Sequence, residues 1–139
     1  MTHAAEGIRV LLADDHQGML NAVRKLLEHE FRIVGEVSDG LALVRAARQL
    51  TPQVMVVDIS MPSMTGLEAV KLLSMERLPS RAVFLTIHDD PAIVEEALAC
   101  GAFGFVSKSA ADRDLPPAVR AAAAGKKFIS ASVRSYSQH

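Results

Sequence analysis

Short apolar runs alternate along the chain with segments in which apolar residues recur every three or four positions. Several of the runs are continuous stretches of Val, Ile, Leu and Met that do not alternate with polar residues. Parallel strands that are covered by helices on both faces have this character. The runs predict strands over residues 8–13, 32–37, 54–57, 82–85 and 104–106.

Helical spacing fills the intervals between these predicted strands. The positions that carry it are Leu20, Val23 and Leu27, then Leu67 and Val70, then Val94, Ala97 and Leu98, and finally Val119, Ala122 and Ala123. A fifth helix is predicted over residues 41–50, and it ends at Thr51-Pro52 because a residue before proline avoids the helical region. Asp90-Pro91 predicts an N-cap followed by the first helical residue. Pro116-Pro117 predicts that the last helix begins at about these prolines and runs to Gly125.

Five strand–helix units predict an α/β domain with a doubly wound, parallel five-stranded sheet. Helices lie on both sides of such a sheet because each crossover is right-handed. We assign residues 1–7 to an N-terminal extension, 8–124 to the domain and 125–139 to a C-terminal linker or tail. The last ten residues have little apolar periodicity and are rich in serine, with Ser130, Ser132, Ser135 and Ser137.

The composition excludes several classes of protein. Hydrophobic residues make up 50% of the chain, which is too many for a disordered protein. The formal net charge of −1 gives no basic surface for nucleic acid. The single cysteine, Cys100, excludes an internal disulfide and favours a reducing compartment. The apolar runs are shorter than the roughly 18 residues of a membrane span. We therefore expect a cytoplasmic domain without a membrane partner.

Polar residues follow four of the predicted strands at the points where the strands end. They are Asp14-Asp15, Asp58, Thr86 and Lys108. Taken singly, each has an ordinary interpretation as a helix cap, a strand residue or a surface lysine. Taken together they point to a site, because the carboxyl ends of parallel strands lie on one rim of the sheet, where such folds bind ligands.

The chemistry of this set favours a metal ion and a phosphoryl group. Three crowded carboxylates repel one another unless a cation compensates them. Oxygen ligands suit Mg²⁺ or Mn²⁺, and the chain has no Cys/His spacing for Zn²⁺. The Thr86 hydroxyl and the Lys108 ammonium are suited to the remaining phosphoryl oxygens. A carboxylate nucleophile would then form an aspartyl phosphate.

These motifs resemble the receiver domain of bacterial two-component response regulators. The resemblance covers roughly residues 8–124. It rests on Asp14-Asp15, Asp58-x-x-Met61-Pro62-x-Met64-x-Gly66, Thr86 and Gly101-Ala102-x-Gly104-Phe105-x-x-Lys108. The motifs Asp14-Asp15-His16, Thr86-x-His88 and Ala124-Gly125-Lys126-Lys127-Phe128-Ile129-Ser130 resemble the NarL/FixJ branch. The resemblance implies a flavodoxin-like sheet with strand order 2-1-3-4-5.

The resemblance also implies a role for each site residue. Asp58 would accept the phosphoryl group. Asp15, Asp58 and the backbone carbonyl of Ser60 would ligate Mg²⁺, with Asp14 acting through water. Lys108 would contact the phosphoryl oxygens, Thr86 would reorient toward them, and Phe105 would turn inward behind Thr86. Family members are signalling proteins and not conventional enzymes, although they hydrolyse their own aspartyl phosphate.

Partners follow from the same resemblance. The phosphoryl group would come from a sensor histidine kinase or a His phosphotransfer protein, and phosphorylation would promote a homodimer. In the NarL/FixJ branch a LuxR-type DNA-binding domain usually follows the receiver. The chain ends at His139 without one, so we expect DNA to be contacted only through an output domain outside this chain.

Two alternatives compete with this interpretation. One is a pseudo-receiver, which would serve as a protein-binding scaffold and never be phosphorylated; the complete set of five polar residues argues against it. The other is a phosphohydrolase that uses an aspartyl-phosphate intermediate on a similar fold. Such an enzyme would need an acid/base aspartate two residues after the nucleophile, where this chain has Ser60.

Overall fold

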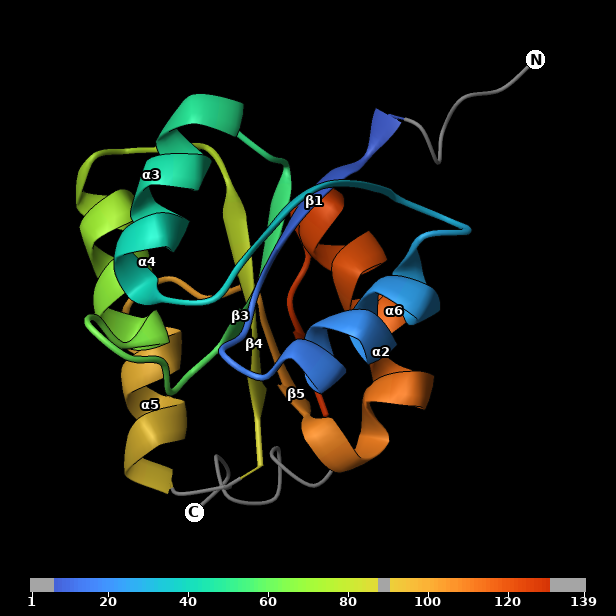
Figure 1. Ribbon diagram of the computed structural model, residues 1–139. Helices are drawn as coiled ribbons and strands as arrows, with labels where there is room; N and C mark the ends of the chain where they lie inside the picture. Colours follow the sequence, from blue (N-terminus) through green and yellow to red (C-terminus); the bar gives the residue numbers. More distant parts are fainter. Residues whose placement is uncertain (1–6, 88–90, 131–139) are drawn as a thin grey trace.

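The computed structural model describes residues 7–87 and 91–130, and it forms one parallel sheet between two layers of helices (Figure 1). The strand order is β2-β1-β3-β4-β5-β6, and every pair of neighbouring strands is parallel. The strands are β1 (Arg9–Ala13), β2 (Arg32–Val37), β3 (Val54–Asp58), β4 (Arg81–Thr86), β5 (Gly104–Ser107) and β6 (Phe128–Ile129). The predicted α/β fold and the order of its first five strands are confirmed.

The helices divide between the two faces of the sheet. In Figure 1, α2 and α6 cover one face, while α3, α4 and α5 cover the other. Their bounds are α2 (Gln17–Leu27), α3 (Gly40–Leu50), α4 (Gly66–Met75), α5 (Pro91–Ala99) and α6 (Ala111–Ala123). A short 3-10 helix (Lys108–Ala110) precedes α6. None of the helices in the described ranges combines the length and the apolar character that crossing a bilayer requires.

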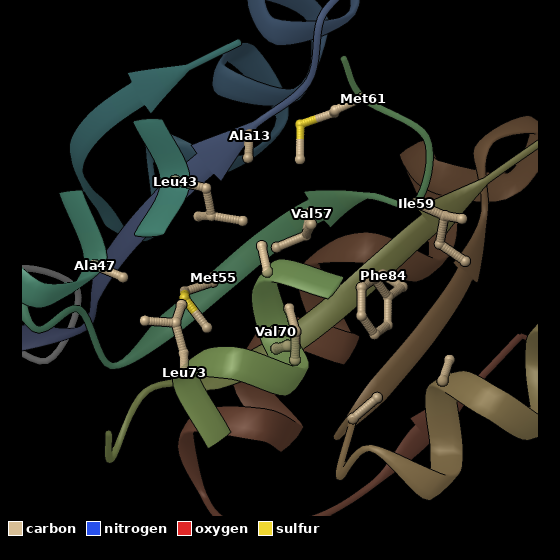
Figure 2. Packing of buried hydrophobic residues seen from close by; sticks show 14 of the residues in the cluster. Ala13, Leu43, Ala47, Met55, Val57, Ile59, Met61, Val70, Leu73 and Phe84 are labelled. Carbon is tan, nitrogen blue, oxygen red and sulfur yellow. The ribbon is translucent and has the colours of Figure 1, made fainter. Parts of the chain in front are cut away.

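Successive residues of the strands supply two separate cores. Val10 and Leu12 on β1 pack with the apolar sides of α2 and α6, whereas Leu11 and Ala13 pack with those of α3, α4 and α5. This alternation follows from the two-residue period of a strand, and it explains why the strands are apolar throughout. Figure 2 shows the second core, where Met55 on β3 and Phe84 on β4 lie against the helices.

The last helix differs from its prediction. We expected it to begin at about Pro116-Pro117, but α6 begins at Ala111 and contains both prolines. A buried apolar face explains this result; it is made of Ala111, Leu115, Ala118, Val119 and Ala122. The proline rings remove the amide donors for the carbonyls of residues 112 and 113. Both of these residues are exposed, so water can bond their carbonyls.

Part of the expected tail also belongs to the fold. Phe128 and Ile129 form β6, which pairs with Gly104 and Phe105 at the edge of the sheet. Ser130 follows and is 1% exposed. The sheet therefore has a sixth strand that the five apolar runs did not predict. Pro91 is the first residue of α5, as predicted, whereas Asp90, its predicted N-cap, lies outside the described residues.

Candidate functional site

The strands bring all the predicted polar residues to the same rim of the sheet. Asp58 is the last residue of β3 and Thr86 the last residue of β4. Asp14-Asp15 follows β1, and Lys108 follows β5. A cleft of about 270 Å³ opens at this rim, and its lining includes Asp15, Asp58, Ser60, Thr86 and Lys108.

Lys108 lies between two buried carboxylates. Its Nζ donates to Asp14 Oδ2 at 3.1 Å and lies 3.4 Å from Asp58 Oδ1. Asp14 is 2% exposed and Asp58 is 6% exposed. Burial of two neighbouring carboxylates is costly, and one ammonium group compensates only part of their charge. The site therefore retains a net negative charge that favours a further cation.

The environment of Asp58 raises the pKa of its carboxyl group from 3.8 to about 6. Burial is the largest cause, and the negative charge of Asp14 adds to it. The Lys108 ammonium and the backbone amide of Ser60 oppose the shift, and that amide lies 3.4 Å from Asp58 Oδ1. At neutral pH the carboxylate is still mostly ionised, which is the form that acts as a nucleophile.

The residues present fit a small divalent cation. Asp14, Asp15, His16 and Asp58 each offer one ligand atom, and these atoms all lie within 4.8 Å of one another. Carboxylate oxygens are the ligands that Mg²⁺ prefers. The acidic pocket predicted from the strand ends is thus present in the structure.

His16 is a contributor that we did not assign to the site from the sequence. Its amide donates to Asp14 Oδ1 at 2.9 Å, and its Nδ1 lies 3.2 Å from Asp15 Oδ1. The imidazole is 73% exposed, so it lies at the surface beside the site. Its backbone amide nevertheless fixes the Asp14 side chain. Its position directly after Asp14-Asp15 was the sequence feature that could have indicated this contribution.

Phe105 is fully buried in the structure, with its ring centroid 6.4 Å from that of Phe84. Its part in a switch together with Thr86 stays a prediction. Thr86, which pairs with Ser107 on β5, is 5% exposed. His88 lies outside the described residues.

The loop after β3 is fixed by a close approach at Gly66. The Gly66 amide donates to the carbonyl of Ile59 at 2.8 Å, and Thr65 and Glu68 form a capping box at the start of α4. A Cβ added to Gly66 would lie 2.2 Å from the backbone oxygen of Asp58. This position therefore has no room for a side chain, which explains the glycine in the motif.

Gly66→Ala should destabilise the fold and displace Asp58. The added methyl would collide with backbone, which cannot move aside as a flexible side chain can, so we expect a loss of about 1–3 kcal/mol. Gly18→Ala is the matched control, because a Cβ at Gly18 in α2 meets nothing within 4 Å. Thermal unfolding measures both variants. An unfolding temperature for Gly66→Ala equal to that of Gly18→Ala would contradict the prediction.

Comparisons with known proteins agree with this geometry. The family model described as "Response regulator receiver domain" matches residues 10–120. Response regulator UvrY from Escherichia coli (strain K12) is 31% identical over 128 residues, covering 91% of this chain and 59% of UvrY. NarL from Mycobacterium tuberculosis, a probable transcriptional regulatory protein, is 33% identical over 132 residues, which cover 92% of this chain and 60% of NarL. The chain thus spans about 60% of the length of these curated relatives.

Solved structures give the same result. The signal receiver domain of the M. tuberculosis NarL superposes with a TM-score of 0.84 at 33% identity, covering 87% of this chain and 99% of that domain. The isolated receiver domain of RcsB from Salmonella enterica serovar Typhimurium was solved with the phosphomimetic BeF3⁻. It has a TM-score of 0.85 at 34% identity, and the match covers 93% of this chain and 97% of that domain. This chain belongs to the response regulator receiver family and matches its NarL/FixJ branch.

Proposed function

We propose that this chain is a phosphorylation-switched receiver that accepts a phosphoryl group on Asp58. The observation that carries the proposal is the position of the Lys108 ammonium, 3.1 Å from Asp14 and 3.4 Å from Asp58, beside an open cleft. A carboxylate that lines a cleft beside an ammonium group has both a nucleophilic oxygen and a group to neutralise the incoming charge. An Asp58 oxygen would bond to phosphorus while the P–N bond of a phosphohistidine donor, or the P–O bond of acetyl phosphate, breaks. The imidazole or acetate would leave with that electron pair, and the product is the aspartyl phosphate.

Asp14, Asp15, Asp58 and the backbone carbonyl of Ser60 are the groups that would hold Mg²⁺ or Mn²⁺, with Asp14 acting through water. The three carboxylates, each with an oxygen within 4.8 Å of the others, support this assignment. The ion would supply charge neutralisation for the phosphoryl oxygens. Because it would also offset the repulsion between Asp14 and Asp58, the ionised form of Asp58 would become easier to maintain.

Thr86 and Lys108 would convert the added charge into a structural response. Phosphorylation adds about −1.5 to −2 charges and strong acceptor oxygens. A change from mostly inactive to mostly active needs about 5.5 kcal/mol of differential stabilisation. Several charge-assisted hydrogen bonds of about 1.5–3 kcal/mol each can supply it. Phe105, whose ring is fully buried in the structure, would take part in this response by turning inward behind Thr86.

We infer the donor, the output and the setting from the relatives. A sensor histidine kinase or a His phosphotransfer protein would donate the phosphoryl group, and homodimer formation would follow phosphorylation. A relative, RcsB, has been solved in complex with DNA and as dimers bound to two parallel DNAs. DNA would be reached through an output domain outside this chain, because this chain has a net charge of −1. The protein would act in the cytoplasm, with self-catalysed loss of the phosphoryl group as its only hydrolytic reaction.

The pseudo-receiver remains the main competitor. The position of Lys108 against both carboxylates speaks against it, since a scaffold has no use for this costly arrangement. The phosphohydrolase alternative is weaker, because Ser60 stands where that chemistry needs a second carboxyl group.

The test is the intact mass of the protein after incubation with acetyl phosphate. We expect one phosphoryl adduct with Mg²⁺ present and a strongly reduced yield after chelation with EDTA, because the carboxylates then remain mutually repelling. Mg²⁺ binding is measured separately by titration. Failure to bind Mg²⁺, together with absence of any adduct, would overturn the proposed function in favour of the pseudo-receiver.

A further inference from the structure

A buried serine fastens the end of β5 next to Lys108. Ser130 is 1% exposed, and its amide donates to the carbonyl of Phe105 at 2.9 Å. Its hydroxyl donates to Asp114 Oδ2 at 2.8 Å and accepts from the amide of Ser107 at 3.2 Å. One side chain therefore joins β5 to α6 through two hydrogen bonds inside the protein.

Asp114 is suited to hold this serine in one orientation. It lies in the first turn of α6, where a negative charge is favoured by the helix dipole, and it is 9% exposed. The guanidinium of Arg113, 3.2 Å from Asp114 Oδ1, is largely exposed and contributes little. A buried carboxylate depends strongly on its hydrogen-bond donors, so the Ser130 hydroxyl is directed toward Asp114. Its lone pair is then left to face the Ser107 amide.

Ser107 lies beyond the part of β5 that β6 covers. The ladder between β5 and β6 includes only Gly104 and Phe105 on β5, so the Ser107 amide takes its partner from the Ser130 side chain instead. On the opposite edge, Ser107 pairs with Thr86 of β4. The next residue is Lys108, whose Nζ reaches Asp14 and Asp58. The backbone that carries Lys108 is thus held from both sides.

We propose that Asp114 and Ser130 are positioning residues for Lys108, which hold the end of β5 so that the ammonium faces Asp58. This inference rests on the proposed function of Asp58 and Lys108. It assigns a task in phosphoryl transfer to two residues that do not line the cleft. The metal ligands are carried by β1 and β3 and by the loops after them, so a displaced Lys108 would leave these carboxylates in place for Mg²⁺.

The test is Ser130→Ala in the full chain, with three readouts. They are the rate of phosphoryl incorporation from acetyl phosphate, the Kd for Mg²⁺ and the unfolding temperature. Misplacement of a reacting group by about 1 Å can cost about 100-fold in rate, so we expect a decrease of about tenfold for a partial shift. The Kd for Mg²⁺ should not rise, because a displaced ammonium competes less with the ion for Asp14 and Asp58. A split between rate and metal affinity would not arise from a general loss of structure.

Two further variants distinguish positioning from loss of structure. Ser130→Thr keeps the hydroxyl and should restore most of the rate. Ser109→Ala is the control. It removes an exposed hydroxyl next to Lys108 that bonds Ser107 Oγ and not Asp114. The phosphorylation rate of this variant should match that of the wild type. If Ser130→Ala does not fold, Asp114→Asn replaces it, because the amide keeps the shape while losing the charge that orients the hydroxyl.

The possible outcomes separate this inference from the proposed function. A wild-type protein that takes up no phosphoryl group would overturn both. A phosphorylated wild type with Ser130→Ala reacting at the same rate, even at a lower unfolding temperature, would overturn only the inference. In that case the hydrogen bond between Ser130 and Asp114 would only stabilise the packing of the chain after β6 against α6.

Discussion

Replacing Asp58 with alanine is expected to abolish incorporation of a phosphoryl group from acetyl phosphate. Asp58 lines the open cleft and has an ammonium group 3.4 Å away. Asp14 is the more buried carboxylate and accepts a hydrogen bond from Lys108, so it is a poor substitute nucleophile. Asp15 also lines the cleft, and its carboxylate lies 3.2 Å from Nδ1 of His16. A carboxylate without Lys108 beside it lacks the cation that would neutralise the transferred charge.

The measurement is the intact mass of wild type and Asp58→Ala, treated in parallel. Asp112→Ala serves as the control, because it removes an exposed carboxylate from the first turn of α6, far along the chain from the motif residues of β1 and β3. It should give the same adduct as the wild type. Full labelling of Asp58→Ala would assign the nucleophile to another residue and would refute the role given to Asp58.

The site was predictable because it depends on topology more than on side-chain detail. Apolar runs located the strands, and the polar residue after each run had to lie on the shared rim of a parallel sheet. Asp58 and Thr86 illustrate this, since each proved to be the last residue of its strand. What the pattern could not supply was the conformation of individual side chains. The full burial of Phe105 depends on the space beside Phe84, which no local pattern reveals.

The last helix and the sixth strand show where tertiary packing overrides the local sequence preference for secondary structure. Proline disfavours a helix interior by removing a donor, but α6 gains more from burying Leu115 and Val119 against the sheet than it loses at two exposed carbonyls. Likewise, Phe128 and Ile129 form too short an apolar run to predict a strand. They pair because β5 presents an open edge to them.

Ser130 was missed for a related reason. It begins a serine-rich stretch, and composition alone predicted a linker there. Its burial follows from contacts with Asp114 and Ser107, which are 16 and 23 residues away along the chain. Asp114 did not indicate this contact either, because an aspartate in the first turn of a helix is usually explained by the helix dipole alone.

Asp58→Asn is expected to raise the unfolding temperature of the metal-free protein at neutral pH. The asparagine resembles the protonated carboxyl group in shape and lacks the charge that burial and Asp14 disfavour. The pKa of Asp58 is raised in the folded protein from 3.8 to about 6, so the folded chain binds this proton more tightly than the unfolded chain does. The corresponding stability is present in full below about pH 3.8 and is lost as the pH rises through about 6.

The size of the effect makes the prediction testable by thermal unfolding in EDTA between pH 4 and 8. A shift of about two pKa units corresponds to about 3 kcal/mol, and in a domain of this size that equals roughly 10 °C in the unfolding temperature. The difference between Asp58→Asn and wild type should vanish near pH 4, grow through pH 5 to 6 and level off above pH 7. Groups distant from Asp58 contribute equally to both proteins, so the difference reports Asp58 together with its coupled neighbours Asp14 and Lys108. Mg²⁺ should stabilise the wild type more than the variant, because the ion offsets a charge that the variant lacks.

A difference in unfolding temperature that stays constant from pH 4 to 8 would mean that the ionised Asp58 does not destabilise the folded protein. The electrostatic account of the site would then be wrong.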